Sequence, residues 1–144
     1  MPELTFTVPD ATIAASHVDL LDRPLFAHLA TVRPDGAPQS SVMWFEWDGD
    51  YLKFTHTKKR QKFRNLANDP RIALSIADPD NPYRFLEVRG VVETIEDDPT
   101  GAFYDRLAER YGSPNRVRDP EVRVVLTVKP TAFVPVDRGQ IVKR

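Results

Sequence analysis

Short runs of alternating apolar and polar residues, separated by tight-turn sequences, restrict most strongly how this chain can fold. Between residues 25 and 56 the chain reverses twice, at Pro34-Asp35-Gly36 and at Asp48-Gly49-Asp50. Proline, aspartate and glycine supply the backbone angles of a β-turn, and Asp-Gly between apolar runs is a strong hairpin signal. Connections this short leave no room for the crossover that parallel strands need, so this half predicts an antiparallel meander.

The predicted strands follow one another at short intervals along the whole chain. Apolar residues alternate most cleanly at Ile72, Leu74 and Ile76, as expected of a strand with one buried face. Gly90, inside a later run, indicates a bulge or a close backbone approach. We predict strands over residues 25–33, 39–47, 51–56, 71–77, 84–95, 122–128 and 132–136.

Helices are predicted over residues 11–21 and 58–68. A third predicted helix is opened by Asp98-Pro99 and runs through about residue 111. Asp10 is a suitable N-cap for the first helix, Pro70 stops the second and Gly112 closes the third. With six or seven strands, this pattern predicts a mainly β (α+β) fold. We expect a closed or partly closed antiparallel barrel with about three flanking helices.

Length and composition limit the classes of function. A chain of 144 residues fits one domain, residues 1–144. The absence of cysteine excludes disulfides, thiolate metal sites and thiol catalysis. A net charge of -1 provides no field to gather nucleic acid or an anionic membrane. Since neither a membrane span nor a signal peptide is recognisable, we expect a cytoplasmic protein that binds neither nucleic acid nor membrane.

The segment Thr57–Arg64 carries the most informative charge pattern. Five of its eight residues are cationic, in a chain that is nearly neutral overall. The segment opens the second predicted helix, where the macrodipole already places positive charge. Its cations repeat at i,i+4, as Lys58 does with Lys62, which disfavours an isolated helix. An anion such as a phosphate, bound by free backbone N–H groups and these cations, would explain the pattern.

Two other interpretations of this basic segment remain open. It is also consistent with an ordinary solvated face, and with neutralisation by acids elsewhere, such as Glu46 or Asp48. Nucleic acid is disfavoured because the segment is short. The three histidines have no metal-ligand spacing, and Ser40-Ser41 lies in no nucleophile elbow, so neither a metal site nor a hydrolase triad is predicted.

Three further motifs resemble those of a known family. Residues 29–38, LATVRPDGAP, resemble the entry signature of the pyridoxamine-phosphate-oxidase-like split β-barrels, and residues 62–71, KFRNLANDPR, resemble their helix-to-strand signature. Glu87-Val88-Arg89-Gly90 matches on a later strand, in the same order and spacing. The resemblance covers about residues 15–138. Within this superfamily the chain looks most similar to the short actinobacterial reductases that use coenzyme F420, a deazaflavin.

This resemblance implies an FMN-binding-like split β-barrel that forms a homodimer, with the cofactor in a groove at the subunit interface. It implies that Arg60 and Lys62, which flank Gln61, bind the cofactor phosphate. The other cofactor-binding residues that it implies are Ser41, Met43 and Trp44 on the second strand, and Thr55 and Thr57 at the end of the third. Among the three histidines, His56 at the end of the third predicted strand is a candidate for the same groove on its position alone, with an ordinary structural role as the alternative, and His28 is expected to be a half-buried strand residue.

The resemblance also implies an activity. The protein would be a coenzyme F420-dependent oxidoreductase that transfers hydride to an electron-poor small molecule, and no catalytic residue is predicted because the cofactor carries the chemistry. Members that bind FMN often have Ser-Arg-Lys where this chain has Arg60-Gln61-Lys62, which favours the deazaflavin. The alternatives are an FMN-dependent pyridoxamine-phosphate-oxidase-like enzyme and a non-catalytic barrel that binds a cofactor or haem.

Overall fold

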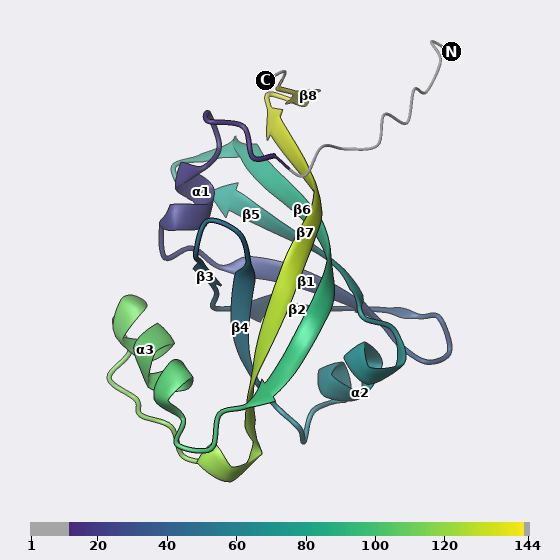
Figure 1. Ribbon diagram of the computed structural model, residues 1–144. Helices are drawn as coiled ribbons and strands as arrows, with labels where there is room; N and C mark the ends of the chain where they lie inside the picture. Colours follow the sequence, from purple (N-terminus) through teal and green to yellow (C-terminus); the bar gives the residue numbers. More distant parts are fainter. Residues whose placement is uncertain (1–11, 143–144) are drawn as a thin grey trace.

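The computed structural model describes residues 12–142, which contain an antiparallel sheet of eight strands. The strand order is β2-β1-β5-β6-β7-β4-β3, and β8 pairs with β7 (Figure 1). Three α-helices and one short 3-10 helix flank this sheet in the described range. The predicted mainly β split-barrel fold is therefore confirmed.

The strands are β1 Ala27–Val32, β2 Pro38–Met43, β3 Glu46–Trp47, β4 Leu52–Thr57, β5 Arg71–Asp78, β6 Asn81–Asp97, β7 Arg123–Asp137 and β8 Gln140–Ile141. The helices are α1 Asp19–Asp22, α2 Gln61–Asn68, α3 Ala102–Arg110 and the 3-10 helix η1 Pro120–Val122. No helix in residues 12–142 is long and apolar enough to cross a membrane.

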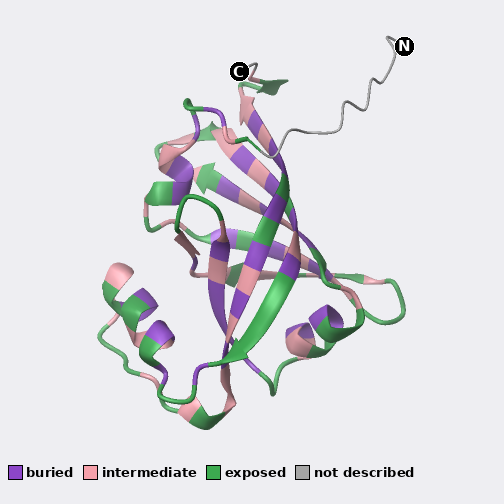
Figure 2. Cartoon of the chain, in the orientation of Figure 1, coloured by how far each residue is buried: buried purple, intermediate pink, exposed green. Residues whose placement is uncertain are grey.

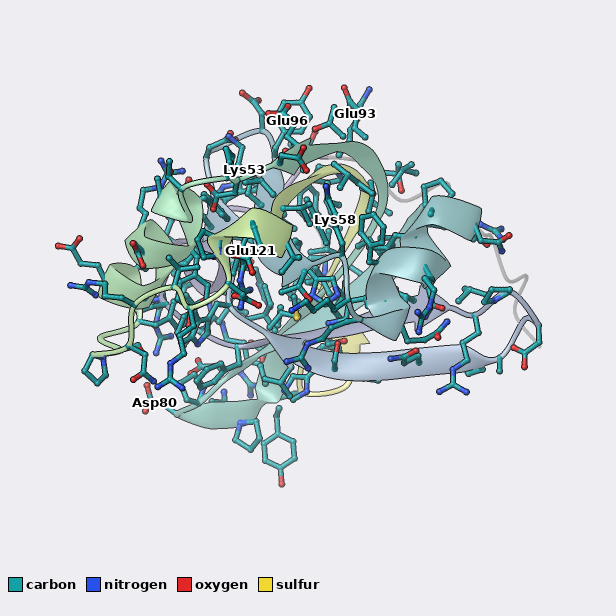
Figure 3. All side chains as sticks on the ribbon, turned by 90° about the horizontal axis from the view of Figure 1, so that it is seen from below. Lys53, Lys58, Asp80, Glu93, Glu96 and Glu121 are labelled. Carbon is teal, nitrogen blue, oxygen red and sulfur yellow. The ribbon has the colours of Figure 1, made fainter. Side chains whose placement is uncertain are left out.

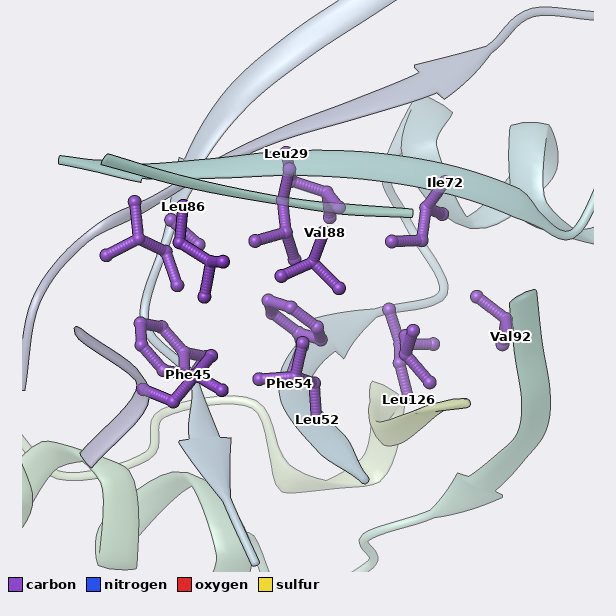
Figure 4. Packing of buried hydrophobic residues seen from close by; sticks show 14 of the residues in the cluster. Leu29, Phe45, Leu52, Phe54, Ile72, Leu86, Val88, Val92 and Leu126 are labelled. Carbon is purple, nitrogen blue, oxygen red and sulfur yellow. The ribbon is translucent and has the colours of Figure 1, made fainter. Parts of the chain in front are cut away.

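The core lies on the inner face of the curved sheet. Strand β4 buries Leu52 and Phe54, and its partner β7 buries Val124, Leu126 and Val128 at alternate positions. Figure 2 shows the resulting alternation of buried and less buried residues along the strands. In Figure 4 the core side chains of several strands point toward one another around Phe54. Period-two patterning therefore places the apolar face of each strand inside.

Helix α2 is fixed to the sheet by a buried amide. Asn65 is fully buried, and its Nδ2 donates to Thr31 Oγ1 at 3.1 Å and to Gln39 Oε1 at 3.0 Å. Leu66 packs into the core beside it. These bonds tie the helix to β1 and β2, so its first turn is held at a defined place against the sheet.

Helix α2 begins three residues later than predicted. The N–H of Lys58 donates to the carbonyl of Val122 at 3.0 Å, which continues the pairing of β4 with the chain before β7. Since this N–H is used outside the helix, the helix begins at Gln61, with Arg60 as its N-cap. Lys58 therefore lies before the helix, and the predicted i,i+4 pair of Lys58 with Lys62 on one helix is wrong.

The predicted strand over residues 39–47 is interrupted. β2 ends at Met43 and β3 begins at Glu46. Between them the N–H of Phe45 donates to the hydroxyl of Tyr111 at 3.0 Å instead of to a neighbouring strand. The side chain of a distant residue thus takes the place of ladder pairing, which no local pattern could have indicated.

The first predicted helix is largely wrong. Its predicted cap and first residue, Asp10 and Ala11, lie outside the described residues, and residues 12–18 form bends and turns. Only Asp19–Asp22 is helical. The buried His17 ring bonds the carbonyl of Val136 through Nε2 at 3.1 Å, so a contact with β7 fixes this segment instead of a continuous helix.

Two boundaries near the end of the chain also differ from the prediction. Residues 123–137 form one continuous strand where two were predicted. Helix α3 begins at Ala102, because Gly101 adopts a left-handed φ of 69° before it.

The predicted close approach and bulge at Gly90 are present. A Cβ on Gly90 would lie 2.7 Å from the carbonyl oxygen of Lys129, and the register of β6 with β7 shifts beside Gly90.

Candidate functional site

A pocket of about 250 Å³ lies where β2, the end of β4 and the start of α2 meet. β2 and β4 both border it although they are not hydrogen-bonded neighbours in the sheet. Six of the eight predicted cofactor-binding residues contribute to its wall. The lining residues are Ser41, Val42, Met43, Thr55, His56, Thr57, Arg60, Lys62 and Arg123.

Lys62 is the most unusual group of this pocket. The residue is only 5% exposed, and within the described residues it forms no ion pair. Its Nζ donates to the thioether sulfur of Met43 at 2.8 Å. A thioether is a weak acceptor, so this contact does not replace hydration of an ammonium group. Burial, with a smaller contribution from Arg60, lowers the pKa of Lys62 to about 8.

The acids proposed as neutralising partners bind other cations. Glu46 pairs with Arg106 at 2.9 Å, and Asp48 lies 3.7 Å from Lys53. That interpretation of the basic segment is therefore wrong for these two acids.

Two other cations of the region do have carboxylate partners. Lys58 pairs with Asp97 at 2.6 Å, outside the pocket lining, and Figure 3 shows Lys58 well apart from the outward-pointing Glu93 and Glu96. Arg123 is held by Asp119 at 3.1 Å. Its guanidinium also lies 4.5 Å from the centre of the Tyr104 ring. Arg60 and Lys62 are the pocket cations without an ion pair among the described residues.

The pocket wall also contains polar atoms without partners. Four buried side-chain N or O atoms in the described residues have no hydrogen-bond partner, and three of them belong to this wall: Ser41 Oγ, Thr55 Oγ1 and His56 Nε2. Each such atom costs free energy unless something binds it. Cations without acids and orphaned polar atoms together fit a polar anionic ligand, such as a phosphate ester.

His56 remains uncharged in this setting. It is 5% exposed at the end of β4. Burial, followed by the charges of Lys62, Arg60 and Arg123, lowers its pKa to about 3. A neutral imidazole carries one N–H donor and one acceptor nitrogen. Next to the cations the pocket therefore holds a hydrogen-bonding group that adds no charge.

Two predicted site residues lie outside the pocket lining. The Trp44 ring stacks on Tyr111, with centroids 5.2 Å apart and an interplanar angle of 14°. Gln61 uses its side chain within α2, where Nε2 donates to Asn65 Oδ1 at 2.9 Å and Oε1 accepts from Arg64 at 3.0 Å. Both side chains are thus engaged in packing or helix contacts in this structure.

Arg123 and Val42 line the pocket but were not predicted. Arg123 lies in the pocket wall because β7 pairs with β4, which places Arg123 opposite Thr57. Since this pairing joins segments more than sixty residues apart, no short sequence motif predicts that Arg123 lies there. Val42 could have been found, since it lies between two predicted residues, Ser41 and Met43, on β2.

Larger hollows lie elsewhere in the described part of the molecule, among them one of about 580 Å³ along residues 137–142, whose wall contains none of the orphaned polar atoms. Another of about 480 Å³ is bordered by Trp47, Lys129 and Phe133, and a third of about 470 Å³ by Arg71, Arg89 and other residues of the sheet. Neither of these two walls contains one of the orphaned polar atoms. In residues 12–142 no group of three or more His, Asp or Glu side chains could hold a metal ion. The smaller pocket is therefore the candidate site.

Comparisons with known proteins show which proteins this chain is similar to. The family model described as pyridoxamine 5'-phosphate oxidase matches residues 13–136. A solved structure named F420 reductase is 57% identical, with a TM-score of 0.83, and the match covers 84% of this chain and 98% of that one.

More distant structures share the fold. A conserved hypothetical protein of Mycobacterium tuberculosis is 26% identical, with a TM-score of 0.69 and coverage of 90% of this chain and 88% of that one. A protein of Listeria innocua described as a putative pyridoxamine 5'-phosphate oxidase is 20% identical, with a TM-score of 0.66, covering 83% and 94%. The search of curated proteins gave no match.

Proposed function

We propose, on the premise that this chain belongs to the pyridoxamine 5'-phosphate oxidase family, that it is an oxidoreductase that uses coenzyme F420. The 57% identical structure named F420 reductase supports the choice of cofactor, because the match covers nearly all of that chain. The small-molecule substrate, the transfer of hydride and the location in the cytoplasm are parts of this proposal.

The observation that carries the proposal is the unpaired charge of the pocket. Lys62 is buried without a carboxylate, and Arg60 stands beside it without one among the described residues. Burying a charged group that has no counterion is costly, so a fold selected for stability alone would not keep it. A phosphate of the cofactor would supply the counter-charge, and the start of α2 adds N–H groups and a favourable dipole.

The residues of the chain would hold and orient the cofactor. Arg60 and Lys62 would bind its phosphate, and Thr55 and Thr57 would border the same groove on β4. When bound, reduced F420 supplies a hydride to an electron-poor acceptor, and the protein contributes position and electrostatic field. No side chain of the described residues is assigned as an acid, base or nucleophile.

A second copy of the chain would complete the groove in this proposal. Val42 is 59% exposed although it lines the pocket, and Phe26 is 54% exposed. An exposed apolar side chain in the wall of a polar pocket, with a second one packed on Tyr111 elsewhere on the surface, supports a homodimer whose interface borders the cofactor. Trp44, which follows Met43 in the chain, stacks on Tyr111 in the same region.

The test is a titration of the purified protein with F420 and, separately, with FMN, followed by cofactor fluorescence. We expect micromolar or tighter binding of F420 and weaker binding of FMN. The double variant Arg60→Ala, Lys62→Ala should lose at least about 100-fold in F420 affinity, since two charge-assisted contacts disappear. Reduced F420 should then be oxidised by an electron-poor acceptor only in the presence of wild-type protein.

Arg64→Ala is the matched control. Arg64 is an exposed arginine of the same helix, bonded to Gln61 and absent from the pocket lining. Its loss should change the affinity by less than threefold. If both variants bind F420 as well as the wild type, the phosphate is bound elsewhere. Preference for FMN would instead assign the protein to the FMN-dependent enzymes.

A further inference from the structure

We propose that His56 is a further ligand of the phosphate in this pocket, donating an uncharged N–H from Nε2. The inference rests on the proposed phosphate site and adds to it a residue that none of the sequence motifs assigned. His56 is placed by β4, between the two threonines Thr55 and Thr57, and directly opposite Val124 of β7. It is held there by the sheet and not by a mobile loop.

Geometry supports this role. The His56 side chain is deeply buried, since the residue is 5% exposed, and Nε2 has no hydrogen-bond partner in the described part of the chain. An orphaned ring nitrogen of this kind is costly in a folded protein, and sites that bind ligands are where such costs are retained. His56 and the cations Arg60 and Lys62 line one and the same pocket.

The charges around His56 decide which form it takes. Three cations face His56: Lys62 on α2, Arg60 at the N-cap of α2, and Arg123 on β7. No acid is among the described residues that line the pocket. Arg123 is already neutralised by Asp119. The positive surroundings disfavour an imidazolium, so the ring is neutral at pH 7. A neutral ring hydrogen-bonds the phosphate without adding a further positive charge to the pocket.

The first experiment follows the histidine side chains of the wild-type protein by nitrogen-15 NMR during a titration with inorganic phosphate. The chain has three histidines, so each signal can be assigned with single substitutions. We expect His56 to be neutral, with the proton on Nε2, and its Nε2 signal to shift on saturation. His17, whose Nε2 is bonded to Val136, and the exposed His28 should not shift. An unchanged His56 signal at saturation, or no phosphate binding, overturns the inference.

Two substitutions measure the size of the contact. His56→Leu removes the donor and keeps the bulk, so phosphate affinity should fall about tenfold, as for one hydrogen bond to a charged group. His56→Gln places an amide N–H near the former Nε2 and should bind within about threefold of the wild type. His28→Gln, on the exposed face of β1, is the control and should have no effect.

Failure of this inference is separable from failure of the proposed function. If F420 binds and Arg60→Ala with Lys62→Ala abolishes binding, but His56→Leu leaves phosphate affinity unchanged, only the role of His56 is wrong. If phosphate binds with the predicted His56 response while F420 does not bind, the anion site stands and the cofactor assignment fails. Because the NMR titration uses the wild-type protein, it decides the question even if His56→Leu does not fold.

Discussion

Strand β4 passes through two environments that differ in how completely their groups are satisfied. Its first half places Leu52 and Phe54 in the apolar core cluster, where both residues are fully buried. Its last residues, Thr55–Thr57, border a pocket that contains cations without an ion pair and polar atoms without a hydrogen-bond partner among residues 12–142. One six-residue strand thus contributes to the core at one end and borders the candidate site at the other. The comparison indicates that the buried groups without partners at the pocket lower the free energy of unfolding, and that the well-packed core beside them offsets this loss.

The largest effect is expected from the core half. Phe54→Ala should lower the free energy of unfolding by about 3–5 kcal/mol, since a buried aromatic side chain is replaced by a cavity. Urea denaturation followed by tryptophan fluorescence measures this loss. Ile141→Ala, at an exposed residue of β8, is the control and should cost less than about 1 kcal/mol. A loss below about 1 kcal/mol in the free energy of unfolding for Phe54→Ala would contradict the assignment of the first half of β4 to the stabilising core.

The pocket that the last residues of β4 border should respond in the opposite direction, and its most buried cation, Lys62 of α2, tests this. Lys62→Met should raise the free energy of unfolding at pH 7 by roughly 1–3 kcal/mol, because it removes a buried charge and keeps the length of the side chain. The pKa of Lys62 falls from 10.5 to about 8 on folding, so the unfolded chain binds more protons between these values. Wild-type stability should therefore rise as the pH increases from 8 toward 10.5, and this rise should be absent in the variant. A destabilised Lys62→Met at pH 7 would contradict the assignment of Lys62 as a costly group.

The third prediction concerns acid. The pKa of His56 is about 3 in the folded protein and 6.5 as the ordinary value, so the unfolded chain binds the extra proton between these values. Stability should therefore decrease as the pH falls below 6.5. His56 alone should contribute about 2 kcal/mol to the decrease between about pH 7 and pH 5. Urea titrations of the wild type and His56→Gln at both pH values isolate this contribution, which should disappear in the variant. Equal losses in both proteins would show that His56 does not titrate in this way.

The smallest effect is expected outside both regions. Glu46→Gln breaks the exposed pair with Arg106, whose side chain is 59% exposed, and should cost less than about 1 kcal/mol. F420 affinity should not change, since Glu46 neither lines the pocket nor pairs with its cations. Parallel denaturation and cofactor titration check both statements. A marked gain in F420 affinity would mean that Glu46 competes with the cofactor for Arg60 or Lys62 in solution.

Much of the fold could be predicted from local patterns. The turn at Pro34-Asp35-Gly36 and the alternation of residues 71–77 specify hairpins and buried faces through short-range physics, and both are present in the structure. Gly90 was correctly expected to mark a bulge, because few other features account for glycine inside a strand. The basic character of residues 57–64 is likewise a property of the sequence itself.

The rest depends on contacts between distant segments. The hydroxyl of Tyr111 interrupts the strand at Phe45, and pairing near Val122 delays the start of α2. The burial of Lys62 and the orphaned nitrogen of His56 depend on how β2, β4, β7 and α2 come together around the pocket, which residue types alone do not reveal. Resemblance to a family supplied the predicted groove-lining residues, yet it could not separate Trp44 and Gln61, which lie outside the pocket lining, from the six that line it.

The pairing of β4 with β7 also sets an order of events during synthesis. Residues Leu52–Thr57 have as their long ladder partner Arg123–Val128, and their other neighbour is the two-residue β3. While the ribosome is still producing the middle of the chain, β4 lacks the strand that holds it straight, so the wall of the pocket cannot yet be fixed. The candidate site is thus completed only after residues 123–128 have emerged, and a nascent chain that stops before Arg123 would contain the basic segment without the strand that completes the pocket around it.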